Sequence, residues 1–148
     1  MGMEIDGVYA PETVAVAKNA YDSLGSTAQI VVKETAKAMD FGPETYDDRV
    51  TSEVVDTARD ALFASLLEVH RGDRAAFEAW CDDHPDYSIE ILGGDDADAI
   101  VWHPAPFAET VIAATYQNEP EAAAATARRR AFGEQYRPAF EATDDEMG

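Results

Sequence analysis

Residues 87–103 begin with the segment Tyr87-Ser-Ile-Glu-Ile-Leu92, which is followed by Gly93-Gly-Asp-Asp96. After two further residues comes a third segment, Ala99-Ile-Val-Trp-His103. The first segment alternates polar and apolar side chains, which is the pattern of a strand with one buried face. The glycine-rich segment predicts a hairpin turn, and the β-branched and aromatic third segment predicts a second strand. The segment Glu109-Thr-Val-Ile-Ala-Ala-Thr-Tyr-Gln117 fits a third strand or a short helix, and its Thr, Val, Ile and Tyr content favours the strand. These residues therefore predict a three-stranded antiparallel meander.

Helical periodicity precedes and follows the predicted meander. Apolar side chains three and four residues apart predict four helices before it and one after it. The predicted helices cover residues 11–24, 26–41, 45–69 or 51–69, 74–82 and 118–136. Gly25 and Pro138 are the expected helix ends, and the third, longest helix is the expected centre of the core. We therefore expect an α+β fold with a single globular domain over residues 1–142, followed by an acidic flexible tail over residues 143–148.

The charge of the chain is unusual for its length. Its 148 residues carry a net charge of −19, and only three of the 11 basic residues are lysines. Such a charge destabilises the compact state by self-repulsion, which molar salt screens because the Debye length falls to about 3 Å. We interpret the acidity as halophilic adaptation to a salt-rich cytoplasm, with hydrated cations around the acidic surface, rather than as a binding surface. Residues 44–98 carry −12 of the charge, so the milder segments 1–43 and 99–148 are the expected places of specific contacts.

Composition also argues against several protein classes. No segment approaches the roughly 18 apolar residues of a membrane-spanning helix. The N-terminal residues lack the basic region and apolar stretch of a signal peptide. Cys81 is the only cysteine, which excludes an intrachain disulfide and a multi-cysteine zinc site. We expect a cytoplasmic protein that contacts no membrane and carries no cofactor.

Cys81, His84 and His103 are the candidate ligands of a divalent metal. A Cys and a His three residues apart at a helix end, with a second His on a strand, would supply three donors. Asp82 or Asp83 would ligate the metal or orient a histidine. The spacing matches no established zinc motif, however, and Cys81 also fits an apolar position on a helix face. We therefore favour a structural role for these residues.

A second candidate site is a small-molecule pocket between the sheet and the helices. Its candidate lining residues are His84, Trp102, His103, Tyr116, Arg128 and Arg129. Catalysis there would need one of the histidines to be partly exposed and paired. The two guanidinium groups would hold a phosphate or a carboxylate. In the simpler interpretation their stems cover apolar surface and their charged ends pair with the abundant carboxylates.

The segment Leu24-Gly-Ser26 fits the turn of a helix-turn-helix DNA-binding motif. The helix after it offers only Gln29, Lys33 and Lys37 for contacts with bases, and the negative charge of the chain opposes phosphate binding. We therefore expect an αα-hairpin within the core and no nucleic acid partner.

Aromatic side chains late in the chain indicate a surface for self-association. These residues are Trp102, Phe107, Tyr116, Phe132, Tyr136 and Phe140. They provide more aromatic area than a small sheet needs in its interior. We expect a non-enzymatic interaction or regulatory protein that acts as a homo-oligomer, most simply a homodimer. A small-molecule-binding protein or minor enzyme and a helix-turn-helix DNA binder remain the alternatives.

Three motifs carry a resemblance to known sequences. They are Gly7-Val-Tyr-Ala-Pro-Glu-Thr13, Trp102-His-Pro-Ala-Pro106 and Gly133-Glu-Gln-Tyr-Arg-Pro138. Together they resemble an uncharacterised family of small acidic haloarchaeal proteins of unknown function, over nearly the whole chain. The resemblance implies a haloarchaeal origin and a cytoplasmic compartment, and it implies no activity and no catalytic residue.

The interpretation of the charge predicts that salt stabilises the fold. We expect the melting temperature to rise between 50 mM and 2 M KCl, because the added salt screens the repulsion among carboxylates. Thermal unfolding followed by circular dichroism measures this change. A melting temperature that is no higher in molar KCl than at 50 mM would contradict the interpretation.

Overall fold

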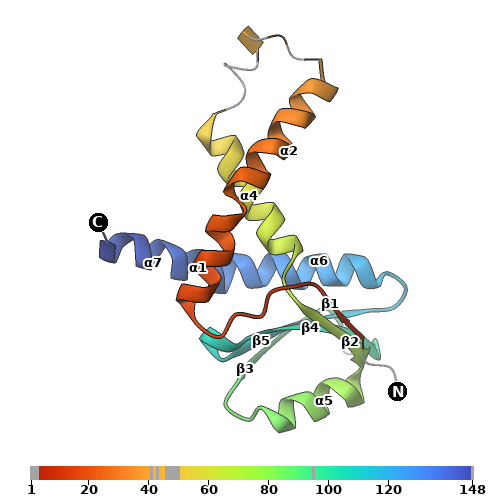
Figure 1. The fold of residues 1–148 in the computed structure, drawn as a ribbon. Coiled ribbons are helices and arrows are strands. Elements are labelled where there is room, and N and C mark those ends of the chain that lie inside the picture. The colour runs from red at the N-terminus through yellow and green to blue at the C-terminus, as the bar shows by residue number, and fades with distance from the viewer. Residues whose placement is uncertain (1–3, 41, 43, 46–50, 95, 148) are drawn as a thin grey trace. The chain divides into compact units, whose positions relative to one another are not determined.

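The computed structural model describes residues 4–40, 42, 44, 45, 51–94 and 96–147, with side chains described up to residue 142 (Figure 1). The described chain divides into two compact units. The larger unit contains the residues up to Ala17 and those from Ala64 onward, and the smaller unit is Lys18–Phe63. The single domain expected over residues 1–142 stays a prediction.

The larger unit is built on a five-stranded mixed sheet, so the α+β fold class is confirmed. The strands are β1 (Glu4–Asp6), β2 (Val69–Asp73), β3 (Ser88–Leu92), β4 (Ala99–Ala105) and β5 (Thr110–Tyr116), in the spatial order β1-β2-β4-β5-β3. All neighbouring strands are antiparallel except β3 and β5, which are parallel. Residues 109–117 thus form the predicted strand rather than a short helix.

The predicted meander is wrong in its order of strands. Strand β3 runs antiparallel to β4 as expected, but β5 lies between them, and Ile89 pairs with Val111 of β5. The Gly93-Gly94 turn therefore does not close a hairpin of paired strands. The alternating pattern of β3 identifies a half-buried strand but does not specify its partner, and this pattern also suits a strand at the edge of a sheet.

Strands β1 and β2 were not predicted from the sequence. The polar sequence Val69-His-Arg-Gly-Asp73 lacks the composition of a strand, and it forms one because it pairs with β4, which is buried along most of its length. The predicted long helix therefore ends earlier. It is α4 (Ser52–Ser65), and Val69 already belongs to β2. Because Phe63 is its buried residue and Val54 is exposed, α4 is not the central core helix.

Helices cover both faces of the sheet (Figure 1). Helix α5 (Arg74–Asp83) packs its Phe77 against Ile100 and Trp102 of β4. It agrees with the predicted helix, and Asp73 caps it by accepting a hydrogen bond of 2.8 Å from the backbone N–H of Ala76. Helix α6 (Pro120–Ala131) lies on the opposite face.

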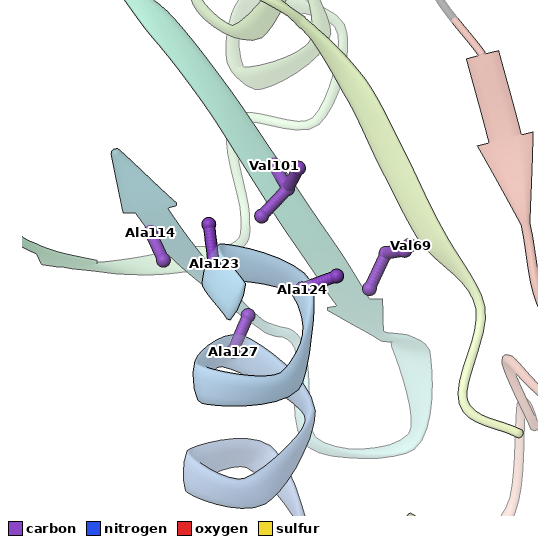
Figure 2. Packing of buried hydrophobic residues seen from close by; sticks show 6 residues of the cluster. All are labelled: Val69, Val101, Ala114, Ala123, Ala124 and Ala127. Atoms are coloured by element: carbon purple, nitrogen blue, oxygen red, sulfur yellow. The ribbon is translucent and has the colours of Figure 1, made fainter. Parts of the chain in front are cut away.

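An alanine stripe brings α6 close to the sheet. Ala123, Ala124 and Ala127 are buried against Val101 of β4 and its neighbours Val69 and Ala114 (Figure 2). Small side chains on the helix and branched side chains on the strands allow the two backbones to approach closely without a void.

The C-terminal helix does not end before Pro138, which corrects the sequence prediction. A π-helical turn (Phe132–Tyr136) follows α6, and α7 (Arg137–Met147) continues through the proline. The wide turn shifts the backbone hydrogen bonds, so that the N–H of Arg137 bonds to the carbonyl of Phe132, five residues earlier. A proline ring ordinarily clashes with a carbonyl one turn earlier, and this change of register accommodates it. Helix α7 extends into the residues predicted as a tail, and the flexibility of that tail stays a prediction.

The smaller unit consists of helices. Most of α1 (Val14–Ser23) and all of α2 (Gly25–Ala38) belong to it, together with most of α4. Helix α1 ends at Ser23, so the predicted break between two helices is present. Gly25 does not end α1, however, but is the first residue of α2, and Leu24 before it keeps a right-handed helical conformation. The helices meet where the Tyr21 hydroxyl donates a hydrogen bond of 2.5 Å to Asp60. The Arg59 guanidinium also lies over the Tyr21 ring, 4.3 Å from its centroid.

Among the described residues, no helix is both long enough and apolar enough to cross a membrane.

Gly7 is expected to be intolerant of a side chain. Its φ is +102°, and a Cβ atom there would overlap the carbonyl oxygen of Leu67 and lie 2.9 Å from the Cα of Glu68. We expect Gly7→Ala to lower the free energy of unfolding by about 2 kcal/mol or more, measured by urea denaturation. Gly133→Ala is the control, because nothing lies within 4 Å of its added Cβ. Equal destabilisation by both substitutions would contradict the argument.

Candidate functional site

Strand β4 separates two of the candidate pocket residues. Successive side chains of a strand point to opposite faces of the sheet. Trp102 is fully buried on the α5 face, where it packs against Phe77, with the ring centroids 5.3 Å apart. His103 is fully buried on the other face, where it contacts Tyr136 of the π-helical turn. These two side chains do not line a common pocket.

His103 makes two hydrogen bonds that determine its protonation. Its Nδ1 lies 2.5 Å from the carbonyl oxygen of Glu68, and its Nε2 lies 2.7 Å from the hydroxyl of Tyr136. A carbonyl only accepts, so Nδ1 carries the proton and donates it, and Nε2 accepts from the Tyr136 O–H. Burial lowers the pKa of His103 to about 4, and burial raises the pKa of Tyr136 above its ordinary value. Both groups are therefore neutral at physiological pH.

His84 lies at the end of α5, on the opposite face of the sheet from His103. Its ring stacks on Trp80 with centroids 3.9 Å apart, and its Nδ1–H donates a hydrogen bond of 2.7 Å to the Trp80 carbonyl. Tyr87 closes this aromatic group, with its ring edge-on to both Trp80 and His84. The stacking and the hydrogen bond hold the His84 ring in one orientation.

The three candidate metal ligands are not brought together. Cys81 lies in α5, and His84 directly follows the last residue of that helix. His103 lies on the other face of the sheet, against Tyr136. Burial raises the pKa of the Cys81 thiol, which favours the protonated form that metals do not bind. In the part of the chain that the structure describes, no three His, Cys, Asp or Glu side chains are arranged to hold a metal ion.

The candidate arginines also diverge. Arg128 donates from Nε to the carbonyl of Leu67 at 2.8 Å, so it joins α6 to the start of β2. Arg129 is exposed and forms no ion pair with the described residues. Arg130 pairs with Glu134 one turn later, at 2.9 Å. Arg128 also forms an ion pair with Asp6 at 3.7 Å, which agrees with the simpler interpretation, in which the charged ends of the arginines pair with carboxylates.

Tyr116 lies at the end of β5 and lines a groove of about 460 Å³ together with Gln117, Asn118 and Thr126. The Tyr116 hydroxyl accepts a hydrogen bond of 3.2 Å from Nε of Arg71. The histidines and arginines of the predicted pocket do not line this groove.

The predicted aromatic surface for self-association is wrong. Four of its six residues are buried in the core, namely Trp102, Phe132, Tyr136 and Phe140. Tyr136 packs between Phe107 and Phe140, with ring centroids 4.9 Å and 6.3 Å away. Aromatic content alone does not separate a core from a surface, and here the five-stranded sheet and the C-terminal helix need these rings in their interior.

The structure also assigns roles to residues that the sequence analysis missed. His70 on β2 pairs with Trp102 in the sheet, and its Nε2 lies 3.2 Å from a carboxylate oxygen of Glu68. His70 Nδ1 and Trp102 Nε1 are buried without a hydrogen-bond partner among the described residues. No sequence signal singled out His70, because it lay in the predicted break between two helices.

A groove in the smaller unit was missed as well. It lies between α2 and α4, has a volume of about 530 Å³ and is lined by Ile30, Lys33 and Val55, among others. The two lysines of α2 were the available signal, because they give this helix a positive charge within a strongly acidic chain.

The turn required for a helix-turn-helix reader is not formed at Leu24-Gly-Ser26. A single residue in a helical conformation separates α1 from α2, and the N–H of Ala28 bonds to the Leu24 carbonyl at 2.8 Å. A DNA-binding helix-turn-helix instead needs a turn of three or four residues that sets its helices at a large angle.

Comparison with known proteins gives the family of the chain and no activity. The chain belongs to DUF5809, a family of unknown function, whose family model matches residues 8–137. No curated protein and no solved structure matches the chain. The resemblance to a family of unknown function is thereby confirmed, and the haloarchaeal origin stays a prediction.

The burial of His103 predicts a pH-dependent stability. Its pKa is about 4 in the folded chain and about 6.5 in the unfolded chain, so between these values the unfolded chain binds more protons. The contribution of the neutral His103 imidazole to the free energy of unfolding is complete above pH 6.5. About 3 kcal/mol of this contribution is lost as the pH falls to 4.

Urea denaturation of the wild type and of His103→Gln across this pH range measures the effect. We expect the unfolding free energy of the variant to fall less steeply with decreasing pH. Tyr136→Phe keeps the imidazole and is the control. We expect its unfolding free energy to change with pH as steeply as that of the wild type. Parallel pH profiles for the wild type and His103→Gln would contradict the assignment.

Proposed function

We propose that this member of DUF5809 is a non-enzymatic interaction module that acts as a homo-oligomer in a salt-rich cytoplasm. The observation that carries the proposal is the exposure of large apolar side chains on the smaller unit. Ile30 and Met39 of this unit are 60% and 61% exposed, and Val31 and Val54 are also exposed. Ile5, Val8, Val16, Ile89 and Ile91 of the larger unit are exposed as well, so the smaller unit is chosen for the larger share of such side chains among its few residues.

The small core of the smaller unit supports the proposed self-association. The buried side chains of α2 are Ala28, Val32 and Ala36, which have little apolar area to bury. Tyr21 and Phe63 are the large buried side chains of the rest of the unit. Burial stabilises by about 25 cal/mol per Å² of apolar surface, so covering Ile30 and its neighbours would add to this small core. Helical units of this kind gain a complete core when further helices pack on them.

The hydrogen bonds of the histidines support the non-enzymatic part of the proposal. Both ring nitrogens of His103 are engaged within the core, and Nδ1 of His84 is bonded to a backbone carbonyl. A general base needs an accessible imidazole beside a reacting group. His103 is fully buried and has no such access.

The charge of the chain supports the proposed salt-rich environment. Two copies of a chain with a net charge of −19 repel one another in dilute buffer. At molar salt that repulsion is screened over a few ångströms, whereas apolar contacts are maintained. Self-association through apolar side chains is therefore compatible with this composition at high salt.

Sedimentation velocity of the full chain in 2 M KCl tests the proposal. Between about 5 and 200 μM we expect the sedimentation coefficient to increase toward that of a dimer, because the apolar side chains of the smaller unit become covered. The same series in 50 mM KCl should show weaker association. A single monomeric species at every concentration and salt would contradict the proposal.

A further inference from the structure

Strand β3 forms one edge of the five-stranded sheet, and among the described residues only β5 pairs with it. The Ser88 N–H donates a hydrogen bond of 2.8 Å to the carbonyl of Glu109, just before β5. Successive residues of a strand direct their backbone groups to opposite sides, so every second residue from Ser88 onward bonds to β5. The N–H and C=O groups of Ile89 and Ile91 therefore point away from β5, along the open edge of the sheet.

The side chains of the same two isoleucines are also exposed. Ile89 is 52% exposed and Ile91 is 43% exposed. They pair in register with Val111 and Ala113 of β5, which are buried together with Phe77 of α5. Residues that pair in register share a face of the sheet, so the two isoleucines lie on the α5 face. The edge thus joins outward-pointing backbone groups to an apolar face.

The opposite edge of the sheet is protected in a way that β3 is not. Proteins protect edge strands by short length, by charged side chains and by prolines. Strand β1 has three residues, of which two are Glu4 and Asp6. Strand β3 has five residues and one charge, Glu90, which points to the other face and forms an ion pair with Arg130 of α6 at 3.8 Å. Strand β3 is therefore the edge that is open to another strand.

We propose that β3 of a second copy of the chain adds to this edge as an antiparallel strand, about a two-fold axis through Ile89. The backbone specifies a strand as the occupant, because extended backbone presents donors and acceptors at the matching spacing of two residues. The side chains fit a copy of β3, because its own isoleucines recur at that spacing and meet this apolar face. This contact goes beyond the proposed function, since it lies in the larger unit and uses none of the exposed side chains of the smaller unit.

Side-chain pairing disfavours two of the central registers for such a contact. A shift by one residue would oppose outward backbone groups to inward ones, so the axis passes through a residue. An axis through Glu90 places the two copies of this carboxylate directly opposite each other, and like charges in that position are destabilising. An axis through Ile91 places Ile89 opposite Gly93, which has no side chain and whose φ of +100° departs from a strand.

The axis through Ile89 gives a favourable partner to each side chain. It places Ser88 opposite Glu90, so that a hydroxyl meets the carboxylate. It also places Tyr87 opposite Ile91, and an aromatic ring opposite a β-branched side chain stabilises a sheet. The two copies of Ile89 exchange both backbone hydrogen bonds, and the Ile91 N–H of each copy donates to the Tyr87 carbonyl of the other. A two-fold contact of this kind uses the same surface on both copies.

The charge around β3 makes the contact dependent on salt. Strand β3 lies within residues 44–98, which carry −12 of the net charge. Two copies therefore repel each other at this edge in dilute buffer. In molar salt the Debye length of about 3 Å is shorter than the spacing of about 4.8 Å between neighbouring strands. We expect the strands to pair in 2 M KCl and to separate in 50 mM KCl.

Disulfide trapping reports both the contact and its register. In a Cys81→Ala background, Ile89→Cys places two cysteines across the axis with their Cα atoms about 5.5 Å apart, within the range of a disulfide. The two cysteines of Ile91→Cys would lie about 14 Å apart along the strands. Ile5→Cys, on edge strand β1, is the control for random collision, because Ile5 is 56% exposed.

We expect Ile89→Cys to form a disulfide-linked dimer at least tenfold faster than Ile91→Cys and Ile5→Cys in 2 M KCl. Mass spectrometry and gel electrophoresis without reductant measure the rates. Circular dichroism verifies that each variant is folded. In 50 mM KCl the rate at position 89 should fall toward that at position 5.

Hydrogen exchange of the wild type tests the contact without a substitution. The outward N–H groups of Ile89 and Ile91 exchange readily in a single copy, whereas the N–H of Glu90 bonds to β5 in either state. We expect exchange at the two isoleucines to slow at least threefold as the chain concentration rises in 2 M KCl, with the rate at Glu90 unchanged. Nuclear magnetic resonance of the ¹⁵N-labelled chain measures each amide.

The outcomes distinguish this contact from the proposed function. Equal trapping rates at positions 89 and 5 would overturn the pairing of β3, and fastest trapping at position 91 would overturn the axis through Ile89. A wild type that sediments as a monomer would contradict the proposed function. Rapid trapping at position 89 would still support the edge contact in that case, because a disulfide captures contacts too weak to sediment as a dimer.

Discussion

The imidazole of His103 connects three segments of the larger unit that are distant in sequence. It belongs to β4, donates to the Glu68 carbonyl just before β2, and accepts from Tyr136 in the π-helical turn. A neutral imidazole has one donor and one acceptor, so the carbonyl determines the tautomer, and the tautomer determines that the phenol donates. Because the site is fully buried, loss of either bond would leave a polar atom without water or another partner. The position of the C-terminal helix on the sheet depends on this interaction.

The alternation of β4 explains why the candidate pocket does not exist as a single site. Trp102 and His103 are adjacent in sequence and therefore lie on opposite faces of the sheet. Helix α5 carries His84 on the first face, and α6 carries Arg128 near the second. The geometry of this strand thus divides the candidate pocket residues between the two faces of the sheet. The polar groups instead join neighbouring elements of the fold.

Charge distribution and apolar exposure indicate the same region for contacts. The first 43 residues carry only −3 of the net charge, and α2, with two lysines and one glutamate, lies within them. The exposed Ile30 and Val31 are on this helix. A strongly charged protein associates most readily where its own charge is weakest, because the repulsion between copies is smallest there. The proposed self-association therefore uses the mild segment.

The sequence by itself determined the fold class, the helix over residues 74–83, the three strands between residues 88 and 116, and the strand character of residues 110–116. These features follow from local periodicity and side-chain shape, which act over a few residues. Tertiary structure alone decided that β5 lies between β3 and β4, that Val69–Asp73 forms a strand, and that the C-terminal helix continues through Pro138. It also decided which aromatic residues are buried and how far apart His84 and His103 lie. The physical reason is that strand partners, burial and helix register depend on contacts between segments distant in sequence, and no local pattern specifies those contacts.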